Sequence, residues 1–264
     1  MIEKPLGPLH LDAPAPGSSF TDLLESIGAG PVISIPPGTL VPSAPEGTTV
    51  LALRYEGGVV MAGDRRATEG HLVAHRRIRK VFPADRFSAV AIAGTAGIAM
   101  DMVRLFQVEL EHYEKIEGIR LTLEGKASFL ARLVRGHLPM AMQGLVVVPL
   151  FAGYDDKEGR GRVYSYDVVG GRYEETDFGS TGSGARLAKS YMRTAYRDGM
   201  DVEEAMSVGV NALVAASSED TATGGPDLKR GILPNVVHID ADGLVEADDD
   251  VIFPLAESAV DNVR

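Results

Sequence analysis

A threonine that follows a glycine at the start of an apolar stretch is the most reactive arrangement in this sequence. The stretch PEGTTVLALR covers residues 45–54, so Gly47 directly precedes Thr48. A threonine hydroxyl is a weak nucleophile unless a base lies beside it. Cleavage after Gly47 would free the α-amine of Thr48, and a pKa of about 7.7–8.0 leaves much of that amine available as a base at neutral pH. One residue would then supply nucleophile and base, although Thr-Thr pairs also occur in ordinary strands.

Two charged residues downstream could support such a nucleophile. Asp64 ends the second apolar segment, and Lys80 lies inside the third. A lysine in an apolar strand is costly to bury unpaired, and an aspartate is its natural partner. A Lys80–Asp64 pair beside Thr48 would hold positive charge near the hydroxyl and lower its effective pKa. Taken alone, Lys80 fits better a solvated lysine at a strand end, next to the exposed Arg76, Arg77 and Arg79.

The elements that must position these residues come in alternating groups. Short apolar runs bounded by turn residues predict strands at 49–55, 58–64, 76–83, 87–94, 144–155, 161–170, 172–180, 236–242 and 244–247. Apolar residues repeated every three or four positions predict helices at 97–118, 121–137, 184–199 and 201–218. Helices in consecutive pairs cannot be single crossovers between parallel strands. The order therefore predicts an α+β protein, a four-layer αββα sandwich of two antiparallel sheets between two helix layers.

The first 47 residues differ from the rest of the chain. They hold nine of the fifteen prolines and a single basic residue, Lys4. Proline fixes φ and removes a hydrogen-bond donor, so regular sheet or a long helix is disfavoured there. A short helix at 20–28, capped by Thr21, is the exception. Composition alone fits a disordered tail, and the alternative is a removable prosegment with one docking helix.

Composition excludes several other classes of function. There is no cysteine, which rules out disulfides, a thiolate nucleophile and a cysteine-based zinc site. The six histidines show no HExxH or other paired ligand spacing, so we expect no metal. A net charge of −11 argues against nucleic acid or an anionic membrane as partner. No apolar stretch approaches the roughly 20 residues of a membrane span, and no signal peptide is recognisable, so we expect a cytoplasmic protein.

Several motifs together resemble the catalytic β subunits of 20S proteasomes, a family of threonine proteases among the N-terminal nucleophile hydrolases. They are Gly47-Thr48-Thr49, Asp64, Lys80, AGTAG at 93–97, GSG at 182–184 and DTATGG at 220–225. The match covers residues 48 to about 247, and the proline-bearing prosegment most resembles the actinobacterial type. The resemblance implies a threonine endopeptidase that degrades unfolded proteins to peptides. It also implies autocatalytic cleavage after Gly47, which would leave 1–47 as a removed prosegment and 48–264 as the catalytic domain.

The resemblance assigns a role to each matched position. Thr48 would be the nucleophile and, once freed, the base, while Asp64 and Lys80 would form its supporting charge pair. The backbone N–H of Gly94 would stabilise the tetrahedral intermediate.

Other matched positions would hold the amine or the substrate. Ser183, Asp220 and Thr223 would hold the Thr48 amine; without the resemblance, Ser183 reads as a turn residue and Asp220 as a helix-end acid. The family usually has serine at 223, and threonine keeps the hydroxyl but must fit its methyl into a tight turn. The backbone at Thr68 and Ala96 would hold the substrate as an added strand.

A specificity pocket is implied by position. Its lining residues would be Ala67, Ile78, Phe82, Ile92 and Met100. All five are apolar, which predicts a preference for large apolar side chains before the scissile bond. Apolar residues in strands are often simply core, which is the alternative reading.

The resemblance also implies partners. Heptameric rings of β subunits would stack on one another and be capped by heptameric rings of α subunits. A separate regulatory ATPase would unfold substrates, because the chain has no GxxxxGK[ST] nucleotide-binding loop. No metal or organic cofactor is implied, because the base is the chain's own amine.

Three alternatives share parts of this pattern. An inactive ring subunit would have the same fold, but this chain retains Gly47, Thr48, Asp64 and Lys80. The bacterial HslV peptidase also begins with Thr-Thr, but it is shorter and lacks a long prosegment. Another N-terminal nucleophile amidohydrolase remains an alternative, except for members that use cysteine.

Overall fold

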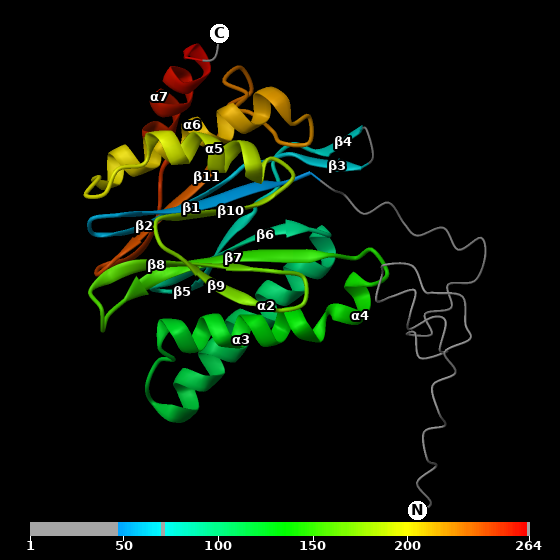
Figure 1. Cartoon of the computed structure of the whole chain (residues 1–264), viewed down its shortest axis with the longest axis vertical. Coiled ribbons are helices and arrows are strands. Elements are labelled where there is room, and N and C mark those ends of the chain that lie inside the picture. The colour runs from blue at the N-terminus through cyan, green and yellow to red at the C-terminus, as the bar shows by residue number, and fades with distance from the viewer. Residues whose placement is uncertain (1–46, 70–71, 263–264) are drawn as a thin grey trace, which may run out of the picture. The chain divides into compact units, whose positions relative to one another are not determined.

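Two stacked β-sheets between two layers of helices form the described part of the chain (Figure 1). The structure is a computed structural model, and it describes residues 47–69 and 72–262. Both five-stranded sheets are antiparallel throughout. This architecture confirms the predicted α+β class and four-layer αββα sandwich. The helix predicted at 20–28, and with it nearly all of the predicted prosegment, lies outside the described residues.

The first sheet carries the strand that follows Thr48. Its order is β10-β1-β2-β11-β12, with bounds Phe178–Gly182, Thr49–Tyr55, Gly58–Gly63, Asn235–Asp240 and Gly243–Glu246. Alternate side chains of β1 face opposite layers. Leu51 and Leu53 join the core beneath the helices, whereas Val50 and Ala52 join the core between the sheets. Burial on both faces explains why β1 is a continuous apolar run.

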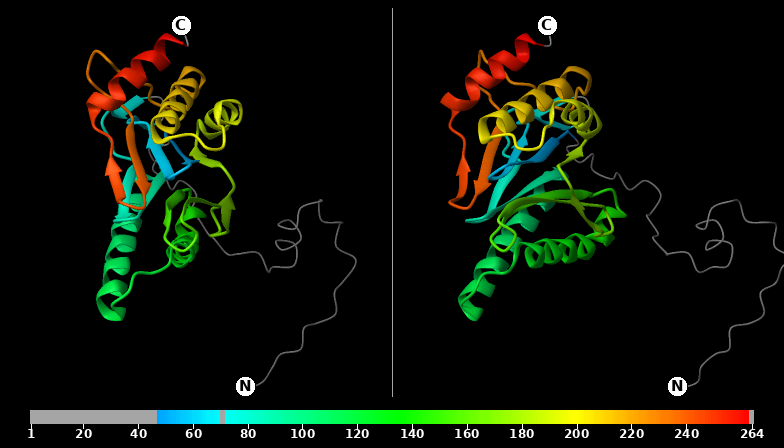
Figure 2. Two further views of the ribbon diagram at one scale, coloured as in Figure 1. Left: turned by 90° about the vertical axis from the view of Figure 1, so that its left-hand side faces the viewer. Right: turned by 60° about the vertical axis from the view of Figure 1, so that its left-hand side comes forward.

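The second sheet has the order β5-β6-β7-β8-β9. Its strands are Val81–Asp85, Ser88–Gly94, Val147–Asp155, Arg160–Tyr166 and Arg172–Glu175. Beneath it lie α2 (Ala96–Glu117), α3 (Leu123–Gly136) and the short α4 (Leu138–Ala141), while α5 (Ala185–Ala195), α6 (Val202–Glu219) and α7 (Asp249–Asp261) cover the first sheet (Figure 2). Every helix in the described ranges is too short or too polar to span a bilayer.

Helix α6 places one candidate site residue. It begins with a capping box, in which the Asp201 side chain accepts from the Glu204 N–H at 2.8 Å and the Glu204 side chain accepts from the Asp201 N–H at 3.2 Å. Such a box satisfies two backbone donors at once and fixes where the helix starts. The helix then ends at Asp220, whose N–H still donates to the Ala216 carbonyl. Asp220 therefore sits on a defined helix end facing Thr48 and its strand.

Three parts of the strand and helix prediction were wrong. Residues 76–80 are not strand: β5 begins at Val81, and a hairpin of β3 (Ala67–Glu69) and β4 (Leu72–His75) precedes them. The predicted strand 172–180 is divided between β9 and β10, which belong to different sheets. Helix α7 was not predicted, because three aspartates begin it and Pro254 lies inside it.

Candidate active site

The backbone around Thr48 is held immediately before β1. Its hydroxyl donates to the carbonyl oxygen of Gly47 at 2.6 Å, and the side chain is largely buried. The Thr48 carbonyl accepts from the Ser183 N–H at 2.8 Å, and its oxygen lies 3.3 Å from the Ser183 hydroxyl oxygen. A Cβ on Gly47 would collide with Oγ1 of Thr68 and lie 2.7 Å from the Ala222 carbonyl oxygen. Only glycine fits at 47, directly beside the reactive hydroxyl.

Lys80 reaches the same carbonyl from the other side. Its Nζ lies 2.9 Å from the Gly47 oxygen, 2.6 Å from Oδ1 of Asp64 and 2.5 Å from the Arg66 carbonyl. The side chain is 3% exposed, and it lies just before β5 rather than inside a strand. Burial lowers the pKa of the Lys80 ammonium below its usual range, while the charge and hydrogen bond of Asp64 oppose that shift. All three ammonium protons have acceptors, so the buried charge is fully paired.

Asp64, fully buried at the end of β2, organises three separate segments. Besides Lys80, its carboxylate accepts from the N–H groups of Thr49 at 2.8 Å, Arg66 at 2.9 Å and Gly224 at 2.9 Å. A carboxylate with several hydrogen bonds is a rigid anchor. It ties β1, the turn after β2 and the loop after α6 to one point.

A second carboxylate, that of Asp220, reaches Thr48 through Ser183. Oδ2 of Asp220 accepts from the hydroxyls of Ser183 at 2.6 Å and Thr223 at 2.5 Å, and Oδ1 accepts from the Ala222 N–H at 3.0 Å. Burial alone would raise the pKa of Asp220, but these hydrogen bonds hold that pKa below its usual range. Thr223 is completely buried, so its methyl is accommodated, and its hydroxyl donates to Asp220.

Gly94 ends β6 and lines cavities that Thr48 also lines. Its φ is 110°, a left-handed value that favours glycine. A Cβ there would also collide with the carbonyl oxygen of Val146. Gly94 and Thr48 line the same two cavities, so the Gly94 backbone borders the space beside the Thr48 side chain.

The chain belongs to the proteasome subunit family. Residues 44–227 match the sequence profile of the family described as "Proteasome subunit". The "Proteasome subunit beta" of Acidimicrobium ferrooxidans is 54% identical over 234 residues, which cover 89% of this chain and 86% of that protein. The "Proteasome subunit beta" of Acidothermus cellulolyticus is 51% identical over 232 residues, covering 86% and 80% respectively. As a family member, the chain is a subunit of a protease that assembles from several subunits.

An apolar cavity opens beside Thr48. It measures about 300 Å³, and all five residues expected for the specificity pocket line it: Ala67, Ile78, Phe82, Ile92 and Met100. Ala96 lines it as well, and Thr68 is buried against Gly47. Every residue predicted for the site therefore lies around one threonine.

A second cavity on the other side of Thr48 was not predicted. It measures about 290 Å³, and Thr95, Val146, Val148, Thr181 and Ser183 are among its lining residues. These five residues come from three segments that are distant in the sequence. No local spacing in the sequence could have indicated their meeting.

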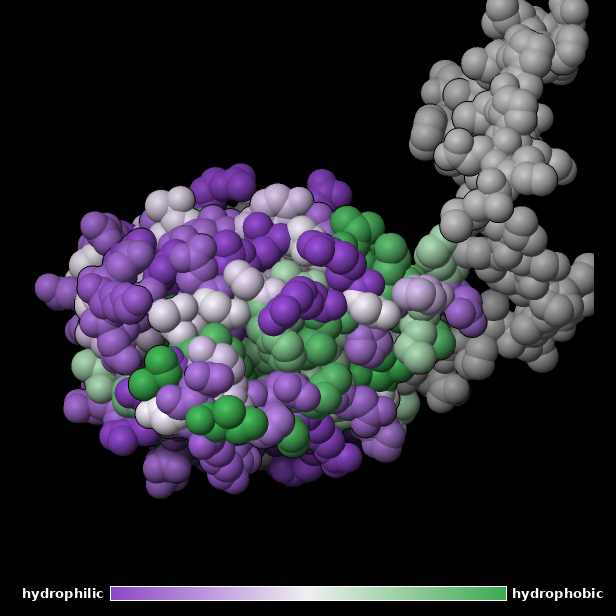
Figure 3. Space-filling model, turned by 90° about the horizontal axis from the view of Figure 1, so that it is seen from below, coloured by the Kyte–Doolittle hydropathy of each residue, from purple (hydrophilic) through white to green (hydrophobic). Residues whose placement is uncertain are grey.

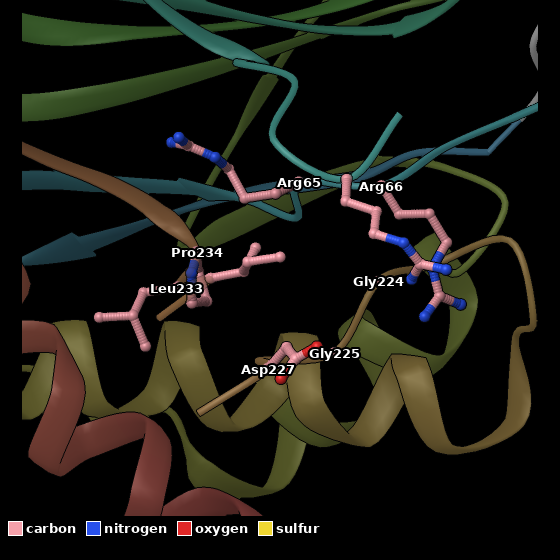
Figure 4. A pocket seen from close by; sticks show the side chains of 9 residues that line it. Arg65, Arg66, Gly224, Gly225, Asp227, Leu233 and Pro234 are labelled. Carbon is pink, nitrogen blue, oxygen red and sulfur yellow. The ribbon is translucent and has the colours of Figure 1, made fainter. Parts of the chain in front are cut away.

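Arg66 is a further part of the site that sequence reasoning missed. Its guanidinium donates to the carbonyls of Thr221 at 2.9 Å and Thr223 at 3.3 Å. Figure 4 shows Arg66 beside Gly224, and both residues line a small cavity of about 40 Å³. Its position two residues after Asp64, next to Arg65, was the one available signal. Arg66 holds the loop that carries Asp220 and Thr223 against the end of β2.

Proposed function

We propose that this proteasome subunit is a threonine endopeptidase, the proteolytic β subunit of a 20S core, with Thr48 as its nucleophile. The observation that carries the proposal is the hydroxyl of Thr48 against the Gly47 carbonyl at 2.6 Å, with Lys80 Nζ on the same oxygen at 2.9 Å. A buried ammonium polarises that carbonyl and favours the negative charge that develops on attack.

Self-processing follows from this arrangement. Oγ1 of Thr48 attacks the Gly47 carbonyl carbon, the Gly47–Thr48 C–N bond breaks, and the hydroxyl proton passes to the departing nitrogen. The product is an ester on Oγ1 and a free α-amine. Water then hydrolyses the ester, releases residues 1–47 as the prosegment and leaves 48–264 as the catalytic domain.

Peptide hydrolysis reuses the same groups. The freed α-amine takes the Oγ1 proton, and Oγ1 attacks the substrate carbonyl carbon. The scissile C–N bond then breaks as the amine passes that proton to the leaving nitrogen, and water hydrolyses the ester left on Oγ1. The Asp64–Lys80 pair orients the hydroxyl, and the N–H of Gly94 stabilises the oxyanion. A substrate strand lies between Thr68 and Ala96.

The remaining assignments concern the amine and the substrate side chain. Ser183, Asp220 and Thr223 hold the amine of Thr48. The apolar cavity lined by Phe82 and Met100 takes a large apolar side chain before the scissile bond. No metal or organic cofactor enters any step, because the amine is the base.

The assembly forms part of the proposal. Heptameric β rings stack on one another and are capped by α-subunit rings, in the cytoplasm. A separate ATPase delivers unfolded proteins.

The test is the N-terminal sequence of the chain after co-expression with an α-type partner, for wild type and Thr48→Ala. We expect Thr-Thr-Val-Leu for the wild type and a retained prosegment for the variant. The same particles are assayed with fluorogenic peptides that carry apolar, basic or acidic residues before the cleaved bond. If both chains keep their full length in assembled particles, an inactive ring subunit replaces this proposal. If peptides are cleaved as fast after basic residues as after apolar ones, only the assignment of the specificity pocket is refuted.

A further inference from the structure

Thr49, the residue after the proposed nucleophile, contacts Asp64 directly and reaches Asp220 through Thr223. Its backbone N–H donates to Oδ1 of Asp64 at 2.8 Å. Its hydroxyl lies 2.6 Å from the hydroxyl of Thr223 and accepts from the Gly184 N–H at 2.9 Å. Thr49 is completely buried, as is Thr223. None of these side-chain contacts belongs to the functions assigned above.

The direction of these hydrogen bonds can be deduced. An ionised carboxylate only accepts, so the single hydroxyl proton of Thr223 points to Asp220, 2.5 Å away. Thr223 then has no proton left for Thr49, and the 2.6 Å contact requires Thr49 to donate. The Thr49 oxygen in turn accepts from Gly184. One directed chain therefore runs from the Gly184 N–H through Thr49 and Thr223 to Asp220.

The surroundings of the Thr49 hydroxyl are too closely packed for a water molecule to take over its hydrogen bonds. A Cβ on Gly184 would lie 2.5 Å from Oγ1 of Thr49 and 2.7 Å from Oγ1 of Thr223. A water molecule cannot enter a site packed this closely. Removing the hydroxyl would leave the Gly184 N–H and one lone pair of Thr223 unpaired in the interior.

We propose that Thr49 is a positioning residue, whose hydroxyl holds Thr223 and Asp220 in register with Thr48 while its N–H is held by Asp64. The inference rests on the proposed threonine-protease function and deepens it. A β-strand fixes the side chain and the N–H of one residue relative to each other. Thr49 therefore links the position of the Asp64–Lys80 pair to the position of the Asp220 carboxylate.

Two substitutions at 49 separate the hydroxyl from the methyl. Thr49→Val keeps the shape and the methyl but removes the donor, and Thr49→Ser keeps the donor but removes the methyl. With turnover counted per mature Thr48 N-terminus by intact mass, we expect Thr49→Val to lower kcat about tenfold, with KM changed by less than about twofold. Thr49→Ser should recover kcat to within about threefold of wild type. A residue that served only packing would give the opposite order.

A double substitution tests whether Thr49 acts through Thr223. Thr223→Val breaks the chain by itself, so adding Thr49→Val should lower kcat by less than about twofold further. If the two residues acted independently, the fold-reductions in kcat of the two single variants would multiply in the double variant. The proposal is overturned if Thr49→Val turns over like wild type, if Thr49→Ser is as slow as Thr49→Val, or if the two substitutions multiply.

Wild-type particles and Thr48→Ala particles accompany every assay. If wild type does not hydrolyse peptides faster than Thr48→Ala, the proposed function itself fails. If wild type is active and any of the three overturning results appears, only the role of Thr49 fails.

Discussion

At the scale of single residues, Lys80 shows how the fold makes a buried charge acceptable. Each of its three protons meets a different acceptor: the Gly47 carbonyl, the Asp64 carboxylate and the Arg66 carbonyl. Removing either partner of a buried pair leaves an uncompensated charge, which is strongly destabilising. The same geometry places an ammonium on the carbonyl that Thr48 would attack. The contacts that pair the buried charge of Lys80 are therefore also the contacts that place its ammonium at the Gly47 carbonyl.

Replacing Lys80 should stop processing. We expect Lys80→Met to slow the loss of the prosegment about 100-fold or more, because the Gly47 carbonyl loses its polarising charge. Lys80→Arg should fail as well, since a planar guanidinium cannot point one nitrogen at three converging acceptors. Intact mass of the co-expressed chain over time measures processing.

Lys126→Met is the matched control for Lys80. Lys126 is also buried and pairs with Asp85 at 2.5 Å, but it lies on α3 and does not line either cavity beside Thr48. Its loss should reduce the yield of particles and leave their processing intact. Normal processing of Lys80→Met would contradict the role of this charge.

Glycine at 47 should be required for processing on steric grounds. In Gly47→Ala the new methyl would collide with Thr68 and lie 2.7 Å from the Ala222 carbonyl oxygen. The backbone must then move away from the hydroxyl of Thr48, and misplacement of about 1 Å can slow a reaction about 100-fold. Gly97→Ala is the control, because a Cβ there meets nothing within 4 Å. Equal processing of both variants, followed by gel shift, would rule out the steric explanation.

At the scale of elements, the sequence predicted the strands and helices that show a clear apolar pattern. Strands β1, β2 and β6 were found because they are buried on both faces. Residues 76–80 failed because their arginines look like one face of a strand, yet two of them are used for local contacts. Arg77 donates to the Arg230 carbonyl at 2.7 Å, and Arg79 pairs with Glu246 at 2.8 Å. Such contacts depend on tertiary partners that no local pattern specifies.

The candidate site, like the fold, was predicted from the sequence only in part. Asp64 and Lys80 follow from chemistry, since they flank apolar strands and need each other. Ser183 and Asp220 came only from the family resemblance, because nothing local distinguishes them from ordinary turn and helix-end residues. Thr49 and Arg66 were missed because their importance lies in hydrogen bonds between distant elements, which only the folded chain displays.

The loop after α6 should depend on Arg66 for its position. In Arg66→Met the carbonyls of Thr221 and Thr223 lose their charged donor. Hydrogen bonds to charged groups are stronger than neutral ones, so we expect kcat per mature N-terminus to fall about tenfold. Arg65→Met is the neighbouring control, because Nε of Arg65 has no hydrogen-bond partner among the described residues. A larger loss for Arg65→Met than for Arg66→Met, in the same peptide assay, would contradict this account.

At the scale of the whole molecule, the surface agrees with a subunit that assembles. Figure 3 shows apolar residues gathered among hydrophilic ones on the side of the second helix layer. Exposed large apolar side chains on α2 and just after it include Leu105, Val108, Ile116 and Ile119. Contiguous exposed apolar surface of this kind marks contact sites. The net charge of −11 helps to keep the separate chain in solution before it assembles.

The second sheet carries a charge cluster that should make the molecule sensitive to acid. Arg162 on β8 binds Glu174 through two hydrogen bonds of 2.9 and 2.6 Å, and it binds Asp155 at 2.8 Å. The Arg162 hydrogen bond holds the pKa of Glu174 below 4.5. Burial alone would raise the pKa of Asp155, but Arg162 and two backbone N–H groups hold it below 3.8. The cluster fastens β7, β8 and β9 to one another.

The folded state should therefore lose stability as the pH falls through the folded-state pKa values of Glu174 and Asp155. Because both folded-state pKa values are depressed, the stabilisation is fully present above the unfolded values of 4.5 and 3.8 and is lost as pH falls through the folded values. We expect the Tm from circular dichroism to be flat from pH 7 to 5 and to drop below about pH 4. Arg162→Met should start with a lower Tm and show a smaller drop, since its carboxylates are no longer held ionised. Arg160→Met should behave as wild type, because the Arg160 side chain is 38% exposed and surface pairs contribute little. Equal drops for wild type and Arg162→Met would place the acid sensitivity in other groups.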